Sequence, residues 1–126
     1  MRDIENSEDI KLLVETFYSK ALNDEKIGPI FKTVHFSLEQ HIPVMVNFWE
    51  TILLDVVSYK GNPMLKHLEM NKTVPLEAEH FERWIKLWKE TVSGRFNGLT
   101  AQQAINRAES IAALMQHKIN QLNQQR

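Results

Sequence analysis

Two histidines, His41 and His67, lie among apolar residues where an imidazole would face the protein interior. His67 belongs to the segment NPMLKHLEM, in which Met64, His67 and Leu68 have the i, i+3, i+4 spacing of one helical turn. A buried imidazole needs a partner, because a buried polar group without one costs about 1–3 kcal/mol. A backbone carbonyl satisfies a core histidine, whereas a neutral imidazole nitrogen is also a common metal ligand. Both interpretations fit either residue taken alone.

Tyr18 and Trp84 also carry polar atoms on apolar helical stripes. Each is an ordinary amphipathic core residue when considered separately. Four such polar tips in one small core are costly to bury unless they converge on a polar guest. A flat apolar cofactor with a central metal is such a guest, since haem iron takes a neutral imidazole on one face and leaves the other for a gas molecule. His67 is then the candidate iron ligand, and Tyr18, His41 and Trp84 are candidate distal donors.

Other chemistry has little support in the sequence. Glu77 and His80 have the ExxH spacing of di-iron bundles, but those bundles need the motif twice and it occurs once here. His35 and His117 lie in polar or boundary contexts and are expected at the surface. The absence of cysteine excludes disulfides, iron–sulfur clusters and covalent haem attachment. With no HExxH motif and no glycine-rich phosphate loop, we assign no catalytic residue.

The composition indicates one globular domain over residues 1–126, with 43% hydrophobic and 25% charged residues. The net charge of −1 and the scattered Lys and Arg argue against a nucleic-acid partner. No apolar run reaches the ~18 residues of a membrane span, which argues against a membrane protein. The polar start MRDIENSEDI does not resemble a signal peptide, so we expect a cytoplasmic protein.

Apolar residues at helical spacing predict an all-α chain with four main helices and no strand. The first stripe runs from Ile10 to Leu22, after a cap at Asn6 or Ser7. A short turn is expected from Pro29.

The start of the second main helix depends on Pro43. Ser37 and Gln40 resemble a capping box, which would start the helix at Leu38. A proline inside a helix costs about 3 kcal/mol, however. We therefore expect a loose turn over 37–41 and a helix from about 42, with His41 at its mouth.

The remaining helices have clearer signals. A loop over 58–63 and the short turn around His67 precede a long helix expected over about 76–96. Asn97-Gly98 is a turn, and Thr100 with Gln103 resembles a second capping box at the start of the last helix.

Four segments together resemble the group III truncated haemoglobins of bacteria, and the resemblance covers nearly the whole chain. They are FYSK with GPIF, HIPVMVNFW, GNPMLKHLEM and HFERWIKLW, in this order and spacing. The resemblance implies a truncated globin fold, a two-over-two helical sandwich around non-covalent haem b. It implies His67 as proximal iron ligand, Tyr18 as main distal donor, and His41 and Trp84 as further distal residues.

The resemblance also implies a set of residues around the haem, namely Phe31, Met45, Phe48, Leu65, Lys66 and Phe81. Lys66 either meets a haem propionate or is an ordinary solvated lysine. Pro43 leaves two positions open for His41, one over the iron and one as a gate.

The implied function is reversible binding of oxygen and of other small ligands such as NO, CO and cyanide. An alternative on the same site is a haem enzyme with nitric oxide dioxygenase or peroxidase-like activity, which needs a reductase partner. A third hypothesis is a haem-free helical interaction module. We expect a monomer or weak dimer.

Overall fold

The computed structural model describes residues 1–34, 37–55, 71 and 76–124 of the 126-residue chain. This part of the chain forms five α-helices and no strand: α1 (Ser7–Leu22), α2 (Gly28–Thr33), α3 (Leu38–Leu54), α5 (Ala78–Arg95) and α6 (Leu99–Gln124). The predicted all-α class is confirmed. Asn6 caps α1 by accepting a hydrogen bond from the Asp9 backbone N–H at 3.0 Å, as one of the two predicted caps.

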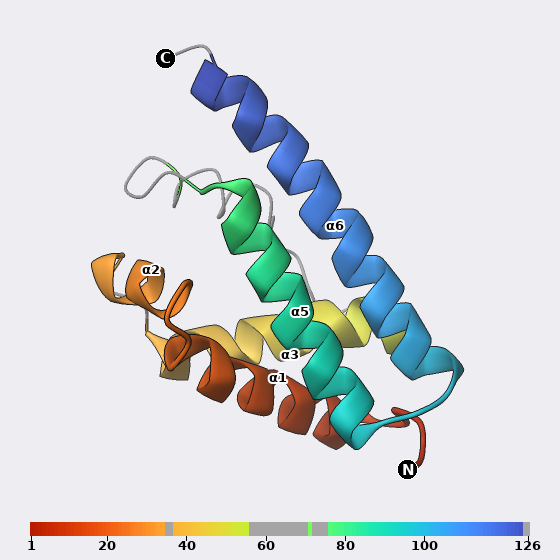
Figure 1. Cartoon of the computed structure of the whole chain (residues 1–126). Coiled ribbons are helices and arrows are strands. Elements are labelled where there is room, and N and C mark those ends of the chain that lie inside the picture. Colours follow the sequence, from red (N-terminus) through yellow and green to blue (C-terminus); the bar gives the residue numbers. More distant parts are fainter. Residues whose placement is uncertain (35–36, 56–70, 72–75, 125–126) are drawn as a thin grey trace.

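Four of these helices form two packed pairs, α1 with α3 and α5 with α6, and the second pair lies across the first (Figure 1). α1 also packs against α5, and α3 against α6. This is the two-over-two arrangement that the resemblance implies. None of the helices in the described residues combines the length and apolar character needed to cross a membrane.

The main core lies where the two pairs meet. α6 presents small side chains to α5 at Ala101, Ala104 and Ala108, all at most 4% exposed. Small residues allow two helices to approach closely, and here the Trp88 indole N–H donates to the Ala104 carbonyl at 3.0 Å. The apolar stripe of α1 covers this contact. It consists of Ile10, Leu13, Val14, Phe17 and Ala21.

The predicted start of α3 is wrong. The helix begins at Leu38 rather than near 42, and Pro43 lies inside it. The Ser37 hydroxyl accepts a hydrogen bond from the Gln40 N–H at 3.4 Å, and the His41 N–H donates to the Ser37 carbonyl at 3.0 Å. Pro43 removes a single intrahelical hydrogen bond in the second turn, and the cap with the packing of Trp49 against the core holds the helix together. His41 therefore lies within the helix, not at its mouth.

The predicted capping box at Thr100 is also wrong. α6 begins at Leu99, and its first N–H groups are satisfied from the other end of the sequence. The Asp3 carboxylate accepts from the Thr100 N–H at 2.9 Å and from the Ala101 N–H at 2.8 Å. Asp3 stays beside α6 because Gly98, with a φ of 149° and no side chain, leaves room for it.

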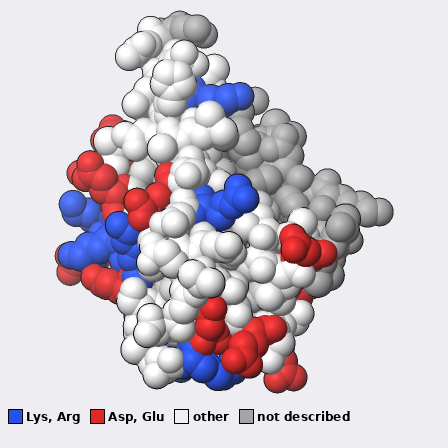
Figure 2. Space-filling model, turned by 90° about the vertical axis from the view of Figure 1, so that its right-hand side faces the viewer, with Lys and Arg blue, Asp and Glu red and all other residues white. Residues whose placement is uncertain are grey.

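Charged side chains are mixed on the surface that Figure 2 shows. Lys and Arg alternate with Asp and Glu, and large parts of this face are uncharged. Among the described residues, two ion pairs are partly buried. The Arg2 guanidinium binds the Asp9 carboxylate, and Arg83 of α5 binds Asp24 in the α1–α2 connection at 2.7 Å. The second pair ties α5 to the end of α1.

Candidate functional site

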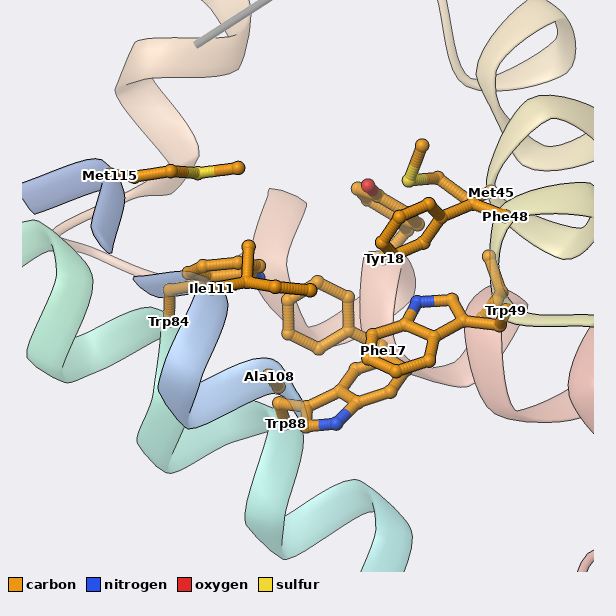
Figure 3. A pocket seen from close by; sticks show the side chains of 11 residues that line it. Phe17, Tyr18, Met45, Phe48, Trp49, Trp84, Trp88, Ala108, Ile111 and Met115 are labelled. Atoms are coloured by element: carbon orange, nitrogen blue, oxygen red, sulfur yellow. The ribbon is translucent and has the colours of Figure 1, made fainter. Parts of the chain in front are cut away.

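An apolar cavity lies where α1, α3, α5 and α6 meet (Figure 3). Eleven side chains line it: Val14, Phe17, Tyr18, Met45, Phe48, Trp49, Trp84, Trp88, Ala108, Ile111 and Met115. The cavity volume is about 40 Å³, and the whole space between the walls out to the open side is about 460 Å³. A single water needs about 10–15 Å³ on the first measure, so the interior admits a molecule of a few atoms.

Tyr18 lines this cavity and is hydrogen bonded to His41, which lies outside the lining. Tyr18 is on the last turns of α1 and His41 on the first turns of α3, and the phenol oxygen lies 2.8 Å from the imidazole Nε2. The two rings meet edge to face, with centroids 5.2 Å apart and planes at 90°. The structure thus turns the His41 ring inward toward Tyr18. Helix α3 places it there because the helix begins at Leu38, with Ser37 as its N-cap one turn before His41.

Burial raises the pKa of the Tyr18 phenol above its ordinary value of 10.0. A buried phenolate would lose its hydration, so the neutral hydroxyl is the stable form at physiological pH. The group consequently keeps a proton that it can donate to His41 or to a molecule in the cavity.

The structure brings three further predicted residues to the same cavity as Tyr18, namely Met45, Phe48 and Trp84. Figure 3 shows Met45 and Phe48 beside Tyr18, whereas Trp84 lies farther along the cavity, near Ile111. Met45 is one helical turn after His41 on α3.

Phe31 and Phe81 lie outside the cavity lining. Phe31, on α2, packs against the Tyr18 ring in an edge-to-face contact, with centroids 6.2 Å apart. It therefore contacts Tyr18 without lining the cavity. Phe81 is buried in a neighbouring apolar cluster with Ile30 and Met115. Their predicted contact with haem stays a prediction. His67, Leu65 and Lys66, the predicted proximal ligand and its neighbours, lie outside the described residues.

Two further histidines, His80 and His117, lie within the described residues, whereas His35, predicted at the surface, lies outside them. His80 Nδ1 accepts a hydrogen bond from the Glu77 N–H at 3.0 Å and takes part in the capping box of α5. His117 is exposed, as predicted. In the part of the chain that the structure describes, no group of three or more His, Cys, Asp or Glu side chains is placed to hold a metal ion.

Sequence reasoning missed Trp49 and Trp88 as lining residues. Their indoles stack with centroids 4.7 Å apart and planes at 19°. In the sequence, Trp49 and Trp88 are large residues on apolar helical stripes. Their spacing is the same for a residue that lines a cavity and for one in a filled core. Ile111 and Met115 of α6 were missed for the same reason.

The lining has the chemistry that a haem requires. The walls are almost entirely apolar and aromatic, which suits a flat macrocycle, and the polar tips of Tyr18 and His41 meet at one place. The enclosed volume of about 40 Å³ is far below the range of about 300–1,000 Å³ typical of cofactor sites. A macrocycle must therefore use the open side of the cavity and part its walls.

Comparison with known proteins agrees with this chemistry. No family model matches the chain. The chain is 34% identical over 118 residues to the group 3 truncated hemoglobin ctb of Campylobacter jejuni, an alignment that covers 90% of this chain and 91% of that protein. It also matches the crystal structure of the group III truncated hemoglobin from Campylobacter jejuni, with a TM-score of 0.82, 34% identity and coverage of 94% and 95% of the two chains. The protein therefore belongs to the group III truncated haemoglobins.

Proposed function

We propose that the protein binds haem b non-covalently in the cavity and reversibly binds oxygen, with NO, CO and cyanide as further ligands. Membership of the group III truncated haemoglobins supports globin-type haem binding. The observation that carries the proposal is the Tyr18 side chain, which lines a largely apolar cavity and whose hydroxyl lies 2.8 Å from His41 Nε2.

When bound, the haem iron supplies the coordination site for a diatomic molecule. The chain supplies the surroundings. The Tyr18 hydroxyl remains protonated through burial and donates a hydrogen bond to a ligand that carries negative charge, where hydrogen bonds are strongest. His41 orients that hydroxyl through Nε2, and Trp84 contributes a second N–H donor. The apolar walls around Met45 and Phe48 exclude water, which strengthens each of these interactions.

His67 is the proposed proximal ligand. Its support is the sequence, because an imidazole in NPMLKHLEM needs a partner and the matching segment of the family supplies the iron ligand. Leu65, Lys66, Phe31 and Phe81 are proposed to contact the macrocycle on the same grounds.

Haem titration of the purified protein, followed by its absorption spectrum, tests the proposal. We expect saturation at one haem per chain and a spectrum typical of a globin, in both the ferric and the carbon monoxide form. A haem-free interaction module would remain colourless and show no saturable change, and that result would overturn the proposal.

A second candidate function is a haem enzyme with nitric oxide dioxygenase or peroxidase-like activity. The Tyr18–His41 hydrogen bond favours it, because a phenol and an imidazole in contact can pass a proton to a reacting ligand. A steady-state assay with nitric oxide or peroxide and a reducing partner separates turnover from reversible binding. Sustained turnover abolished by Tyr18→Phe would support the enzyme, whereas a single stoichiometric reaction would support reversible binding.

We further propose a cytoplasmic protein that acts as a monomer or weak dimer and meets a reductase that keeps its iron reduced. The mixed charges of the surface in Figure 2 are compatible with a transient electron-transfer encounter. Sedimentation at several protein concentrations tests the oligomeric state, and a stable higher oligomer would contradict the proposal.

A further inference from the structure

We propose that Trp49 and Trp88 form a one-electron donor beside the cavity, which reduces a peroxide reacting at the bound haem and holds the resulting positive charge. This inference rests on the proposed haem binding for the source of the oxidant. The property of the indole pair itself is independent of haem.

The two indoles are close, parallel and shielded. Their centroids are 4.7 Å apart with an angle of 19° between planes, and the residues are 5% and 3% exposed. Both line the cavity, and Figure 3 shows one ring lying over the other at its edge. Phe17 packs edge-on against Trp88 with a centroid distance of 5.3 Å, and Phe48 packs edge-on against Trp49 at 5.2 Å. An electron therefore crosses only van der Waals contacts between the pair and the cavity.

Stacking lowers the energy of an oxidised indole. A positive charge on one ring faces the π cloud of the other, and tryptophan has the ring that attracts cations most strongly. Burial opposes the charge because it removes hydration. The Ala104 carbonyl oxygen, 3.0 Å from Trp88 Nε1, offsets part of that loss with its negative end. Because a backbone carbonyl is not a base, the oxidised pair keeps its N–H proton and remains a radical cation.

The reaction balances with reduced haem as the second donor. Hydrogen peroxide accepts two electrons and two protons, its O–O bond breaks, and two water molecules form. One electron comes from iron(II), which becomes iron(III), and the other comes from the indole pair, which becomes a radical cation. Solvent supplies both protons. No covalent bond within the protein forms or breaks.

Tyr18 is the competing donor at this cavity. Oxidation of its phenol would move the proton to His41 across the 2.8 Å hydrogen bond. That transfer creates an imidazolium in a partly buried position, whereas the stacked pair spreads its charge over two rings. We infer that the electron leaves the Trp49–Trp88 pair in preference to Tyr18.

Electron paramagnetic resonance (EPR) tests the assignment. Haem-loaded protein in the iron(II) form receives one equivalent of hydrogen peroxide without oxygen and is frozen at once. We expect a radical signal close to one spin per iron(III) formed, and incorporation of ring-deuterated tryptophan narrows it. Trp49→Phe and Trp88→Phe each lower this ratio severalfold. Phe96→Leu, the control, removes a buried ring outside the cavity lining and preserves the ratio. Trp84→Phe tests whether the third indole at the cavity is the donor instead.

The proposal is overturned if the signal narrows with deuterated tyrosine instead, or if only Trp84→Phe lowers the ratio. Trp88→Phe also removes the hydrogen bond to Ala104, so Trp49→Phe is the deciding variant. An unchanged ratio in folded Trp49→Phe overturns the proposal. Oxidised peptides of the unchanged protein provide a further readout without any variant. We expect oxygen addition at Trp49 and Trp88 and an unmodified Trp84, and the reverse pattern would contradict the proposal.

A second arm separates this inference from haem binding. The full chain without haem is oxidised by a photogenerated one-electron oxidant in solution, and the radical is identified in the same way. A tryptophan radical that the two stack variants diminish supports the pair even if haem titration fails. A radical confined to Tyr18 overturns the pair even if haem binds normally.

Discussion

Tyr18 lines a largely apolar cavity, and His41, on a different helix, is its hydrogen-bond partner outside the lining. Neither residue has an unusual sequence context, and each satisfies the other at 2.8 Å. Because burial raises the pKa of the phenol, the pair presents a hydroxyl rather than a phenolate to the cavity. The proposed retention of a bound ligand depends on this one donor more than on any other residue.

Tyr18→Phe is expected to speed oxygen dissociation at least about tenfold. The change removes a hydrogen bond to a charged acceptor, worth about 1.5–3 kcal/mol, and leaves the ring in place. Stopped-flow displacement of oxygen by carbon monoxide measures the rate. Ser19→Ala is the matched control, since it removes an exposed hydroxyl one residue away on α1. An oxygen dissociation rate that is equal in Tyr18→Phe and in the unchanged protein would retire the proposed role.

At the scale of elements, helix α3 brings His41 to Tyr18 because the helix already begins after the Ser37 cap, although it contains Pro43. The sequence contains both signals, a capping box and a proline, and they conflict. General helix energetics favoured a late start, whereas the cap and the packing of Trp49 against the core outweigh one missing hydrogen bond. Element existence and type were predictable from periodicity here, but this boundary depended on tertiary contacts.

Pro43→Ala is expected to raise the free energy of unfolding by about 1–3 kcal/mol. Alanine restores the N–H that the helix lacks and removes the crowding of the proline ring. Urea unfolding measures the change. Pro29→Ala is the comparison, because Pro29 lies in the first turn of α2, where a proline costs little, and we expect a much smaller effect. A destabilised Pro43→Ala would mean that α3 does not continue through residue 43 as described.

The start of α6 gives a second element-scale expectation. Asp3→Ala removes the carboxylate that caps the Thr100 and Ala101 N–H groups, and the loss of a cap costs about 0.5–2 kcal/mol. Asp3→Asn retains one acceptor oxygen and should recover part of that stability. Glu25→Ala, which removes an exposed carboxylate, is the control. Equal stability of Asp3→Ala and the control would show that α6 starts without help from the N-terminal segment.

At the scale of the whole molecule, the sequence predicted the helical architecture better than the contacts between residues that are far apart in the chain. Four apolar stripes at helical spacing and four family-like segments were sufficient for the helical sandwich and for Tyr18, Trp84, Met45 and Phe48 at one cavity. The contacts of Asp3 with α6 join residues 97 and 98 positions apart in the sequence, so no local pattern could predict them. The stacking of Trp49 on Trp88 likewise depends on how α3 crosses α5.

Acid should lower the free energy of unfolding, because it protonates carboxylates that hold separate parts of the fold together. Burial opposes ionisation of Asp3 and Asp24, but hydrogen bonds from the α6 backbone and from Arg83 hold their pKa values below the ordinary 3.8. The Arg2 guanidinium does the same for the pKa of Asp9. A lowered folded-state pKa gives stability that is complete above about pH 4 and is lost as the pH falls through the folded-state value.

Urea unfolding at pH 6 and below pH 3 measures this dependence. We expect a smaller free energy of unfolding in acid, and a smaller difference between the two pH values in Asp24→Asn than in the unchanged protein. A free energy of unfolding that stays constant down to pH 3 would contradict the ion pairs as described.

The central claim is that an imidazole at position 67 coordinates a haem held by this helical sandwich. The most direct measurement compares absorption spectra of haem-loaded His67→Ala and unchanged protein in the reduced state, with His117→Ala, an exposed histidine, as the control. If His67 is the iron ligand, His67→Ala loses the spectrum of imidazole-ligated iron, whereas the control retains it. An unaltered imidazole-ligated spectrum in His67→Ala would contradict the account.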